Sequence, residues 1–376
     1  MLKNFFKENV KYYWRNIDKT IFISFMLLFT LGIFFSFAST STLAGERLNK
    51  DYYFFFSKHL TFATLAIFLM IVISYIQLDF FKKILIPIFV ISLISLVLVL
   101  FFGVEVKGSK RWLDLLFFRF QPIEFVKPFF IVTIAKILSK ESLHTSNISY
   151  FFSFLVLTIP CIILLNQPDV GQTVLLILSW SAVVFISGMK LIYILSFFGL
   201  TVVSVIGLTL ALPDKFTYIF QRIETFFDPT KGDRFQSSNA LDAIREGGLT
   251  GQGMGEGTLK VRVPEAHTDY IISVIAEEFG SIISILLICI FLYISFRIVK
   301  FTLSENDKFI KISLSGLATL LIFQTFIHIG VNTSLLPTTG MTLPFLSYGG
   351  SSMIGSAILA GIILNFTKRR FLNERY

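Results

Sequence analysis

The sequence has little charge. Only 15% of its 376 residues are Asp, Glu, Lys or Arg, while 54% are hydrophobic. Soluble domains contain about a quarter charged residues, so this share excludes a soluble globular protein and indicates an integral membrane protein. The formal net charge is +9. In a chain of many spans, Lys and Arg report topology first, and we expect no nucleic-acid partner.

Cysteine and cofactor-binding patterns are scarce as well. The two cysteines, Cys161 and Cys289, lie in apolar runs, which excludes a thiolate metal cluster and gives no reason to expect a disulfide. The glycine-rich stretch "GLTGQGMGEGT" (248–258) lacks the Gly-Lys-Ser/Thr of a nucleotide-binding loop. We interpret it as a flexible loop. The sequence requires no cofactor.

Long apolar runs dominate what remains. About 20 apolar residues cross the hydrocarbon core of a bilayer. By that rule the sequence predicts an all-α membrane protein with ten transmembrane helices, at residues 20–39, 60–78, 84–103, 123–139, 150–166, 171–188, 191–211, 269–296, 309–332 and 344–366.

The basic residues predict the orientation of these spans. Cytoplasmic connections carry an excess of Lys and Arg, and the first 19 residues hold five such cations. Alternation then places both termini in the cytoplasm. We expect one polytopic domain over 1–376, with a cytoplasmic leader (1–19), a large extracytoplasmic loop (212–268) and a cytoplasmic tail (367–376). The long basic leader favours an uncleaved first span over a signal peptide.

The predicted outer face is also basic, with 14 cations in its segments. Long loops tolerate basic residues, which accounts for those in 212–268. The stretch "KGSKRWLDLLFFRF" (107–120) is short and close to the membrane. Its cations suggest an anionic partner there, such as a lipid phosphate.

The stretch "VPEAHTDY" (263–270) places two carboxylates and an imidazole just before a predicted span. Pro264 and Glu265 are typical of a helix start, and Asp269 can be no more than an acid that complements the helix dipole. Alternatively, Asp269 is partly desolvated at the membrane boundary. Its pKa would then be raised, which suits it to take a proton from an alcohol. His267 is a second base, an orienting residue or a bystander.

Further polar residues cluster at the same predicted face or just inside it. Glu277 and Glu278 lie inside the eighth predicted span, as structural ion-pair members or as the lining of a polar cavity. The stretch "PTTGMTLPFLSYGGSS" (337–352) interrupts the chain with prolines and glycines before the last span. Non-helical backbone at membrane depth is tolerated where protein or water covers it. The others are Glu124, Lys127, Asp169, His328 and Asn332.

Four stretches together resemble the SEDS family of bacterial membrane proteins, whose branches are FtsW and RodA. They are "GSKRWLDLLFFRFQPIEFVK" (108–127), "QPDVGQT" (167–173), "GQGMGEGTLKVRVPEAHTDYIISVIAEEFG" (251–280) and "LLPTTGMTLPFLSYGGSS" (335–352). The likeness covers residues 20–368. Ala266 and the 337–352 stretch favour the FtsW branch, although Thr339 stands where FtsW sequences often have Lys.

The resemblance implies an inverting peptidoglycan glycosyltransferase that polymerises lipid II on the outer face of the cytoplasmic membrane. The 4-hydroxyl of the GlcNAc on lipid II would attack the anomeric carbon of the MurNAc at the end of the growing glycan. That glycan is linked to undecaprenyl diphosphate, which leaves. The family's essential acid falls on Asp269, as the general base. A divalent cation (Mg or Mn) can bridge the diphosphate, but no metal-ligand spacing demands one.

Positive charge must meet the leaving diphosphate. The candidates are Lys107, Lys110, Arg111, Arg119, Lys127, Arg245, Lys260 and Arg262. Supporting polar candidates are Glu124, Asp169, Glu265, His267, Glu277, Glu278, Ser347 and Ser351.

The resemblance also implies partners and a place in the cell. The expected partners are a class B penicillin-binding protein, which is an FtsI-like transpeptidase, and other membrane proteins of the division machinery. The expected site is the inner membrane at the septum. Alternatives are a RodA-like polymerase of elongation, a lipid II flippase with Glu277, Glu278, Gln324 and His328 on its route, and a non-catalytic division scaffold.

Overall fold

The structure is a computed structural model, and it describes residues 11, 13–40, 54–106, 109–115, 118–140, 148–211, 213–228, 235–260 and 262–368. Ten of its helices coincide with the ten predicted spans. They are α2 (Lys19–Thr40), α4 (Phe54–Tyr75), α5 (Leu78–Phe102), α6 (Ile123–Leu138), α7 (Ile148–Asn166), α8 (Val170–Ile186), α9 (Leu191–Ala211), α12 (Ile271–Leu303), α13 (Lys308–Asn332) and α14 (Gly350–Phe366). The all-helical membrane fold predicted from the apolar runs is confirmed.

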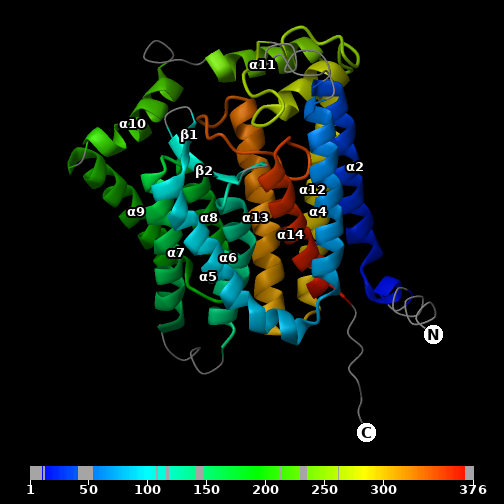
Figure 1. Ribbon diagram of the computed structural model, residues 1–376. Helices are drawn as coiled ribbons and strands as arrows, with labels where there is room; N and C mark the ends of the chain where they lie inside the picture. The colour runs from blue at the N-terminus through cyan, green and yellow to red at the C-terminus, as the bar shows by residue number, and fades with distance from the viewer. Residues whose placement is uncertain are drawn as a thin grey trace.

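These helices run up and down in one bundle (Figure 1). Six of them, among the described residues, are long and apolar enough to cross a membrane, and α8 and α14 are shorter apolar helices. The outer surface of the bundle is apolar, as for Phe68, Phe101 and Phe296. Exposed aromatic residues in this arrangement are explained by contact with lipid.

The centre of the bundle is formed by α14, α13 and α6, whose residues are mostly buried. Small residues allow them to approach closely. A Cβ on Gly355 of α14 would lie 2.7 Å from the carbonyl oxygen of Glu124, and one on Gly316 of α13 would lie 2.6 Å from Ile131. These three helices therefore form a closely packed base for the loops above them.

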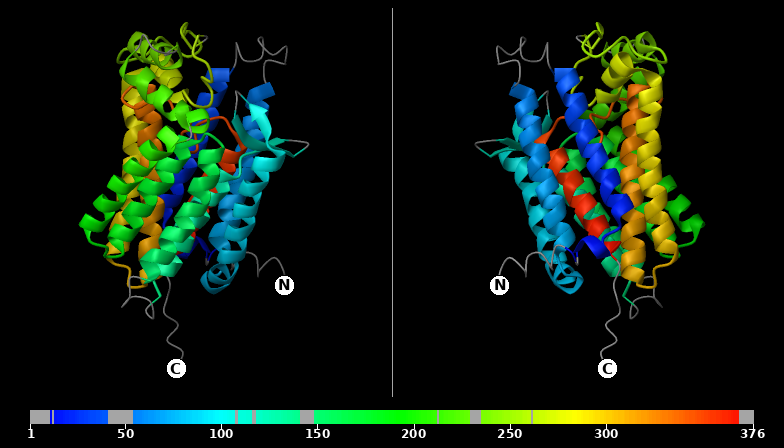
Figure 2. Two further views of the ribbon diagram at one scale, coloured as in Figure 1. Left: turned by 90° about the vertical axis from the view of Figure 1, so that its left-hand side faces the viewer. Right: turned by 90° about the vertical axis from the view of Figure 1, so that its right-hand side faces the viewer.

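One end of the bundle carries the short sheet, two extra helices and the longest loops, and we call it the outer end. Figure 2 shows these loops gathered there in both side views. The extra helices, α10 (Pro213–Phe227) and α11 (Phe235–Gly247), lie in the predicted large loop. Helix α2 starts and α14 ends at the opposite end (Figure 1), as an even number of passes requires.

The connection between α5 and α6 forms a sheet that we did not expect. Strands β1 (Val104–Val106), β2 (Ser109–Leu115) and β3 (Phe118–Phe120) pair antiparallel in the order β1-β2-β3. Lys110 faces Glu105 across one pair, and Arg119 faces Asp114 across the other. Such cross-strand pairs of opposite charge stabilise a sheet by about 0.2–1 kcal/mol each.

Helix α12 is broken at Gly280, where φ is +85°. A Cβ at this position would collide with the carbonyl oxygen of Leu249, so only glycine lets the two backbones approach. The loop after α11 therefore crosses α12 directly at the break.

At the break, the loop 248–253 takes over hydrogen bonds that a regular helix would make to itself. The N–H groups of Ser281 and Ile282 donate to loop carbonyls at 3.0 and 3.3 Å. The carbonyls of Glu277 and Glu278 accept loop N–H groups at 2.9 and 3.0 Å. The glycine-rich stretch is thus bonded into the helix, and the prediction of a flexible loop is wrong for this part of it.

Candidate active site

The turn before α12 presents Asp269 at the outer end. Three successive N–H groups, of Thr268, Asp269 and Tyr270, lie 3.0–3.3 Å from the carbonyl oxygen of Glu265. The helix itself begins at Ile271. The predicted helix start at 264–265 is therefore wrong, because Glu265 has φ +56° and forms a tight turn instead. Asp269 lies outside the first turn of the helix.

The backbone of Asp269 is held from α13. The side-chain amide of Asn332 donates to the carbonyl oxygen of Asp269 at 3.0 Å and to that of His328 at 2.8 Å. Ser273 donates to the amide oxygen of Asn332 at 2.7 Å. Asn332 is fully buried, so these bonds fix where the carboxylate of Asp269 emerges.

The loop between α13 and α14 forms the opposite wall. His328 Nδ1 bonds to the carbonyl oxygen of Met341 at 2.7 Å, and Gln324 Nε2 donates to that of Thr342 at 3.1 Å. Gly340, with φ +69°, lies at the tip. Gln324 and His328 of α13 therefore hold the loop between α13 and α14 in place.

Gly340 marks the point where two functional candidates converge. A Cβ placed on Gly340 would lie 3.5 Å from Asp269 Oδ2 and 3.8 Å from Arg111 Nη1. The carboxylate and the guanidinium thus flank the same small space, which glycine keeps open. Base and cation come from segments more than 150 residues apart in the chain.

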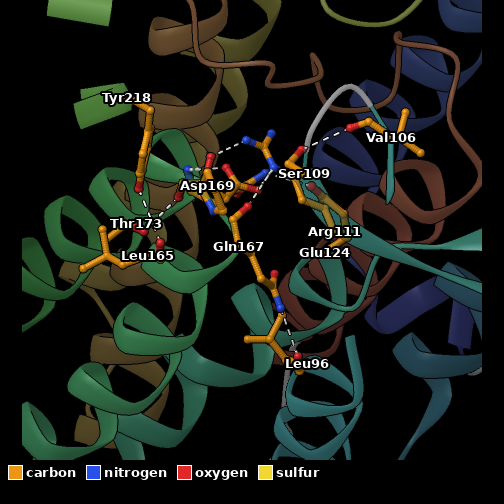
Figure 3. A network of polar contacts seen from close by, with 12 residues as sticks. Leu96, Val106, Ser109, Arg111, Glu124, Leu165, Gln167, Asp169, Thr173 and Tyr218 are labelled. Carbon is orange, nitrogen blue, oxygen red and sulfur yellow. Dashed lines mark hydrogen bonds and ion pairs between the residues drawn. The ribbon is translucent and has the colours of Figure 1, made fainter. Parts of the chain in front are cut away.

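Arg111 reaches this point from β2, whose alternation directs Lys110 and Arg111 to opposite faces. Its guanidinium donates to the carbonyl oxygens of Gln167, at 3.2 Å, and Pro168, and it lies 3.7 Å from Asp169 Oδ2 (Figure 3). The sheet is thereby fastened to the turn between α7 and α8.

Asp169 caps α8 and is buried. Its carboxylate accepts a hydrogen bond from the N–H of Gln172 at 3.4 Å. Burial raises the pKa of Asp169, and the charges of Arg111 and Arg222 oppose that rise. Arg111 thus lies close to this carboxylate, and the charge of Arg222 also acts on it.

Arg222 of α10 was not among the candidates, although its charge acts on this site. It donates to the carbonyl oxygen of Thr338 at 3.4 Å. Burial lowers its pKa first, and the neighbouring Arg111 lowers it further. The amphipathic pattern of 213–227 could have indicated a helix. The sequence contains no signal that α10 would bring this residue to Arg111.

Glu124 and Lys127 form a buried pair beneath the site. Lys127 Nζ lies 2.8 Å from Glu124 Oε2 and donates to Gln324 Oε1 at 3.0 Å. The other oxygen of Glu124 accepts from Gln172 at 3.2 Å. The pair links α6, α8 and α13, which favours a structural role for Lys127 over direct binding of a diphosphate.

Lys260, Glu277 and Glu278 form a second buried cluster. Glu277 accepts the N–H groups of Leu259 and Lys260 at 2.6 and 2.7 Å, and Lys260 Nζ forms an ion pair with Glu278. These contacts hold the loop after α11 on α12. They favour a structural role for both glutamates, and Glu278 forms the ion pair with Lys260.

His267 and Ser347 tie the segment of Asp269 to its surroundings. Ser347 donates to the carbonyl oxygen of Thr268 at 2.6 Å. The ring of His267 packs 5.5 Å from those of Phe55 and Tyr348. This packing favours an orienting role for His267.

The remaining candidates differ in how far they are buried. Ser351 is buried and accepts the N–H of Gln121 at 2.9 Å. Four cations are exposed, namely Lys110, Arg119, Arg245 and Arg262. Lys107 lies outside the described residues.

This arrangement offers few protein ligands for a metal ion. Within the described ranges, no three His, Cys, Asp or Glu side chains come together as a metal site requires. A divalent ion here would need oxygen ligands from a bound diphosphate in addition to those of the protein.

Comparison with known proteins places this site in a family. Residues 18–371 match the model of a family described as "Cell cycle protein", which is named for FtsW, RodA and SpoVE. This chain belongs to the FtsW/RodA/SpoVE family. The SEDS resemblance read from the four sequence stretches is thereby confirmed.

Two relatives of this chain carry the same name. The chain is 35% identical over 359 residues to a protein of Caulobacter vibrioides named "Probable peptidoglycan glycosyltransferase FtsW", covering 95% of this chain and 91% of the relative. A Haemophilus influenzae protein of the same name is 32% identical, with 92% and 89% covered. Both names support the FtsW branch over RodA.

The fold matches a solved structure. A chain from work described as "Structural coordination of polymerization and crosslinking by a peptidoglycan synthase complex" superposes with a TM-score of 0.76. The identity is 23%, with 93% of this chain and 97% of that chain covered. This likeness establishes the membrane fold, and the family match rests on the sequence.

Proposed function

We propose that this protein is a peptidoglycan glycosyltransferase that polymerises lipid II on the outer face of the cytoplasmic membrane, in septal wall synthesis during cell division. One observation carries the proposal: Asp269 and Arg111 converge at Gly340, at the outer end of a chain whose relatives bear this activity in their names. The sugars of lipid II lie just outside the bilayer, at the level where these side chains emerge.

In this mechanism Asp269 acts as the general base. Its carboxylate accepts the proton of the GlcNAc 4-hydroxyl while that oxygen forms a bond to the MurNAc anomeric carbon of the growing glycan. The bond between this carbon and the diphosphate oxygen breaks with inversion, and the electron pair leaves with undecaprenyl diphosphate. General bases typically contribute about 10²- to 10⁴-fold.

Positive charge near the leaving group is the second requirement. Arg111 is the candidate whose Nη1 faces the space at Gly340. Its bonds to Gln167, Pro168 and Asp169 hold the guanidinium in place, so it is preorganised for a negative charge. The assay described below tests whether a divalent ion supplies additional positive charge.

The partner we propose is a class B penicillin-binding protein with transpeptidase activity. The structural relative comes from work on a complex that polymerises and crosslinks peptidoglycan. The test is therefore made on the purified protein together with this partner. Lipid II is supplied with and without Mg²⁺ and Mn²⁺, and glycan chains are separated by length.

We expect long glycan chains from the wild-type complex and none from the partner alone. Translocation of lipid II across vesicles without polymerisation would replace the proposal by a flippase. If neither polymerisation nor translocation occurs under any metal or partner condition, the non-catalytic scaffold would be the function that remains. The flippase alternative places Gln324, His328, Glu277 and Glu278 on a transport route. In this structure these side chains bind loops or Lys260.

Gly340 offers a test of the space between base and cation. Gly340→Ala adds a methyl group within 4 Å of both Asp269 Oδ2 and Arg111 Nη1. We expect kcat/KM for lipid II to fall about 10- to 100-fold, because the methyl group occupies space between base and cation and would shift the reacting groups of the substrate, and a misplacement of about 1 Å has effects of that size. Steady-state polymerisation kinetics measure the change.

The matched control is Gly255→Ala. Gly255 also has positive φ, at +86°, but no atom lies within 4 Å of an added Cβ. Both variants carry backbone strain, and only one occupies the site. Equal losses in the two variants would show that strain, and not the filled space, lowers the rate.

A further inference from the structure

A cavity of about 450 Å³ opens beside the site, between α10, α11 and the loop after α13. Its walls include Tyr218, Arg222 and Thr225 of α10, Ser237 and Ser238 of α11, and Thr338. Cavities of about 300–1,000 Å³ bind small organic ligands. None of the roles assigned above to Asp269 or Arg111 uses this space.

The lining combines apolar side chains with several hydroxyl groups and one charged side chain. Hydroxyl groups come from both helices and from the loop, and Arg222 is the one charged side chain among the described residues that line the cavity. Hydroxyl and guanidinium groups donate hydrogen bonds to carbonyl and carboxylate oxygens. The cavity therefore suits a peptide that bears a carboxylate.

Arg222 links this cavity to the reacting groups. It bonds to the carbonyl oxygen of Thr338, two residues before Gly340, and it is electrostatically coupled to Arg111 and Asp169. Asp169 lies 3.7 Å from Arg111, and its charge also acts on Arg222. Arg222 itself lines the cavity, so an anion bound there would meet its guanidinium group.

The position of the cavity decides which part of the substrate it can take. Its walls belong to α10, α11 and the loop beyond the end of α13, and both helices lie at the outer end of the bundle (Figure 1). The lipid diphosphate lies toward the membrane. The part of lipid II that extends outward is the peptide on the lactyl group of MurNAc, and this peptide carries carboxylates.

We propose that the cavity binds the peptide of lipid II and that Arg222 binds one of the peptide's carboxylates. The proposal rests on the function proposed above. It makes the enzyme selective for a precursor that already carries its peptide and excludes bare disaccharide lipids. Arg222 is thus a specificity-determining residue.

The experiment pairs changes in the protein with changes in the substrate. Wild type, Arg222→Gln and Glu224→Gln, each in complex with the partner, receive three substrates: lipid II, lipid II with amidated peptide carboxylates, and the disaccharide lipid without peptide. Glu224 lies on α10 away from the cavity lining. The measured quantity is kcat/KM for each combination.

For wild type we expect about a tenfold lower kcat/KM on amidation, the size of one lost bond to a charged group. With lipid II, the kcat/KM of Arg222→Gln should be lower than that of wild type by this same factor. With the amidated substrate, the two proteins should have the same kcat/KM. Glu224→Gln should behave as wild type. Equal use of all three substrates by wild type would overturn the proposal.

A uniform loss in Arg222→Gln, with the peptide-free substrate included, would also overturn it, because Arg222 would then act on the sugars or the diphosphate. If Arg222→Gln does not fold, Ser238→Trp fills the cavity from α11. It should lower the use of peptide-bearing substrates more than that of the peptide-free one. Absence of polymerisation by wild type with every substrate would contradict the proposed function instead.

Discussion

Replacing Asp269 with Asn is expected to lower the rate of glycan polymerisation by about 10²- to 10⁴-fold, the contribution of a general base. Asparagine keeps the shape of the side chain but is neutral and cannot accept the proton of the attacking hydroxyl. The backbone of residue 269 would still be held by Asn332. Lipid II should therefore still bind, and the loss should appear in kcat with little change in KM.

The matched control is Glu256→Gln, which removes a carboxylate from an exposed position of the same outer segment. It should polymerise lipid II as wild type does. Single-turnover kinetics with labelled lipid II, on proteins matched for expression and thermal stability, measure both variants. Full activity of Asp269→Asn would show that Asp269 is not the general base. Arg111 would then have no catalytic partner at this position.

Replacing Lys127 with Met should destabilise the protein by about 3–5 kcal/mol, the cost of leaving one member of a buried ion pair alone. Lys127 and Glu124 are both almost fully buried, and Nζ is shared between Glu124 and Gln324. Unfolding in lipid nanodiscs by heat or denaturant measures this loss. Activity should fall with it, since α6, α8 and α13 meet at this pair.

A double variant separates charge from packing. Glu124→Gln combined with Lys127→Met leaves no isolated charge, so it should recover much of the lost stability. Lys110→Met, at an exposed position of β2, should change the unfolding free energy by less than about 0.5 kcal/mol. A double variant as unstable as the single one would mean that packing, and not the unpaired carboxylate, sets the cost.

The sequence predicted the bundle because apolar runs of membrane length leave few alternatives. Each of the ten predicted spans contains a helix, although the last one begins at Gly350 and not at 344. Pro344 and two glycines keep the preceding turn out of the helix. The position of Asp269 at the outer end was also predictable, since it directly precedes an apolar span, while its role as the general base stays a prediction.

What the sequence did not reveal depends on contacts between distant segments. The alternating pattern of 104–120 is typical of strands, but basic residues there were interpreted only as a charged connection. Lys260 resembles other outer cations, and only the fold pairs it with Glu278. The place of Arg222 was equally unpredictable, because no local sequence pattern indicates that α10 meets the turn of Asp169.

The hydrogen bonds exchanged at Gly280 have a mechanical consequence. Because loop 248–253 is bonded to both sides of the break, the first turns of α12 and this loop form one stiff body that includes Asp269 at its edge. Ser281 and Ile282, after the break, donate to the same loop. The loop therefore braces the break from both sides, and the segment of Asp269 is held to the span beneath it.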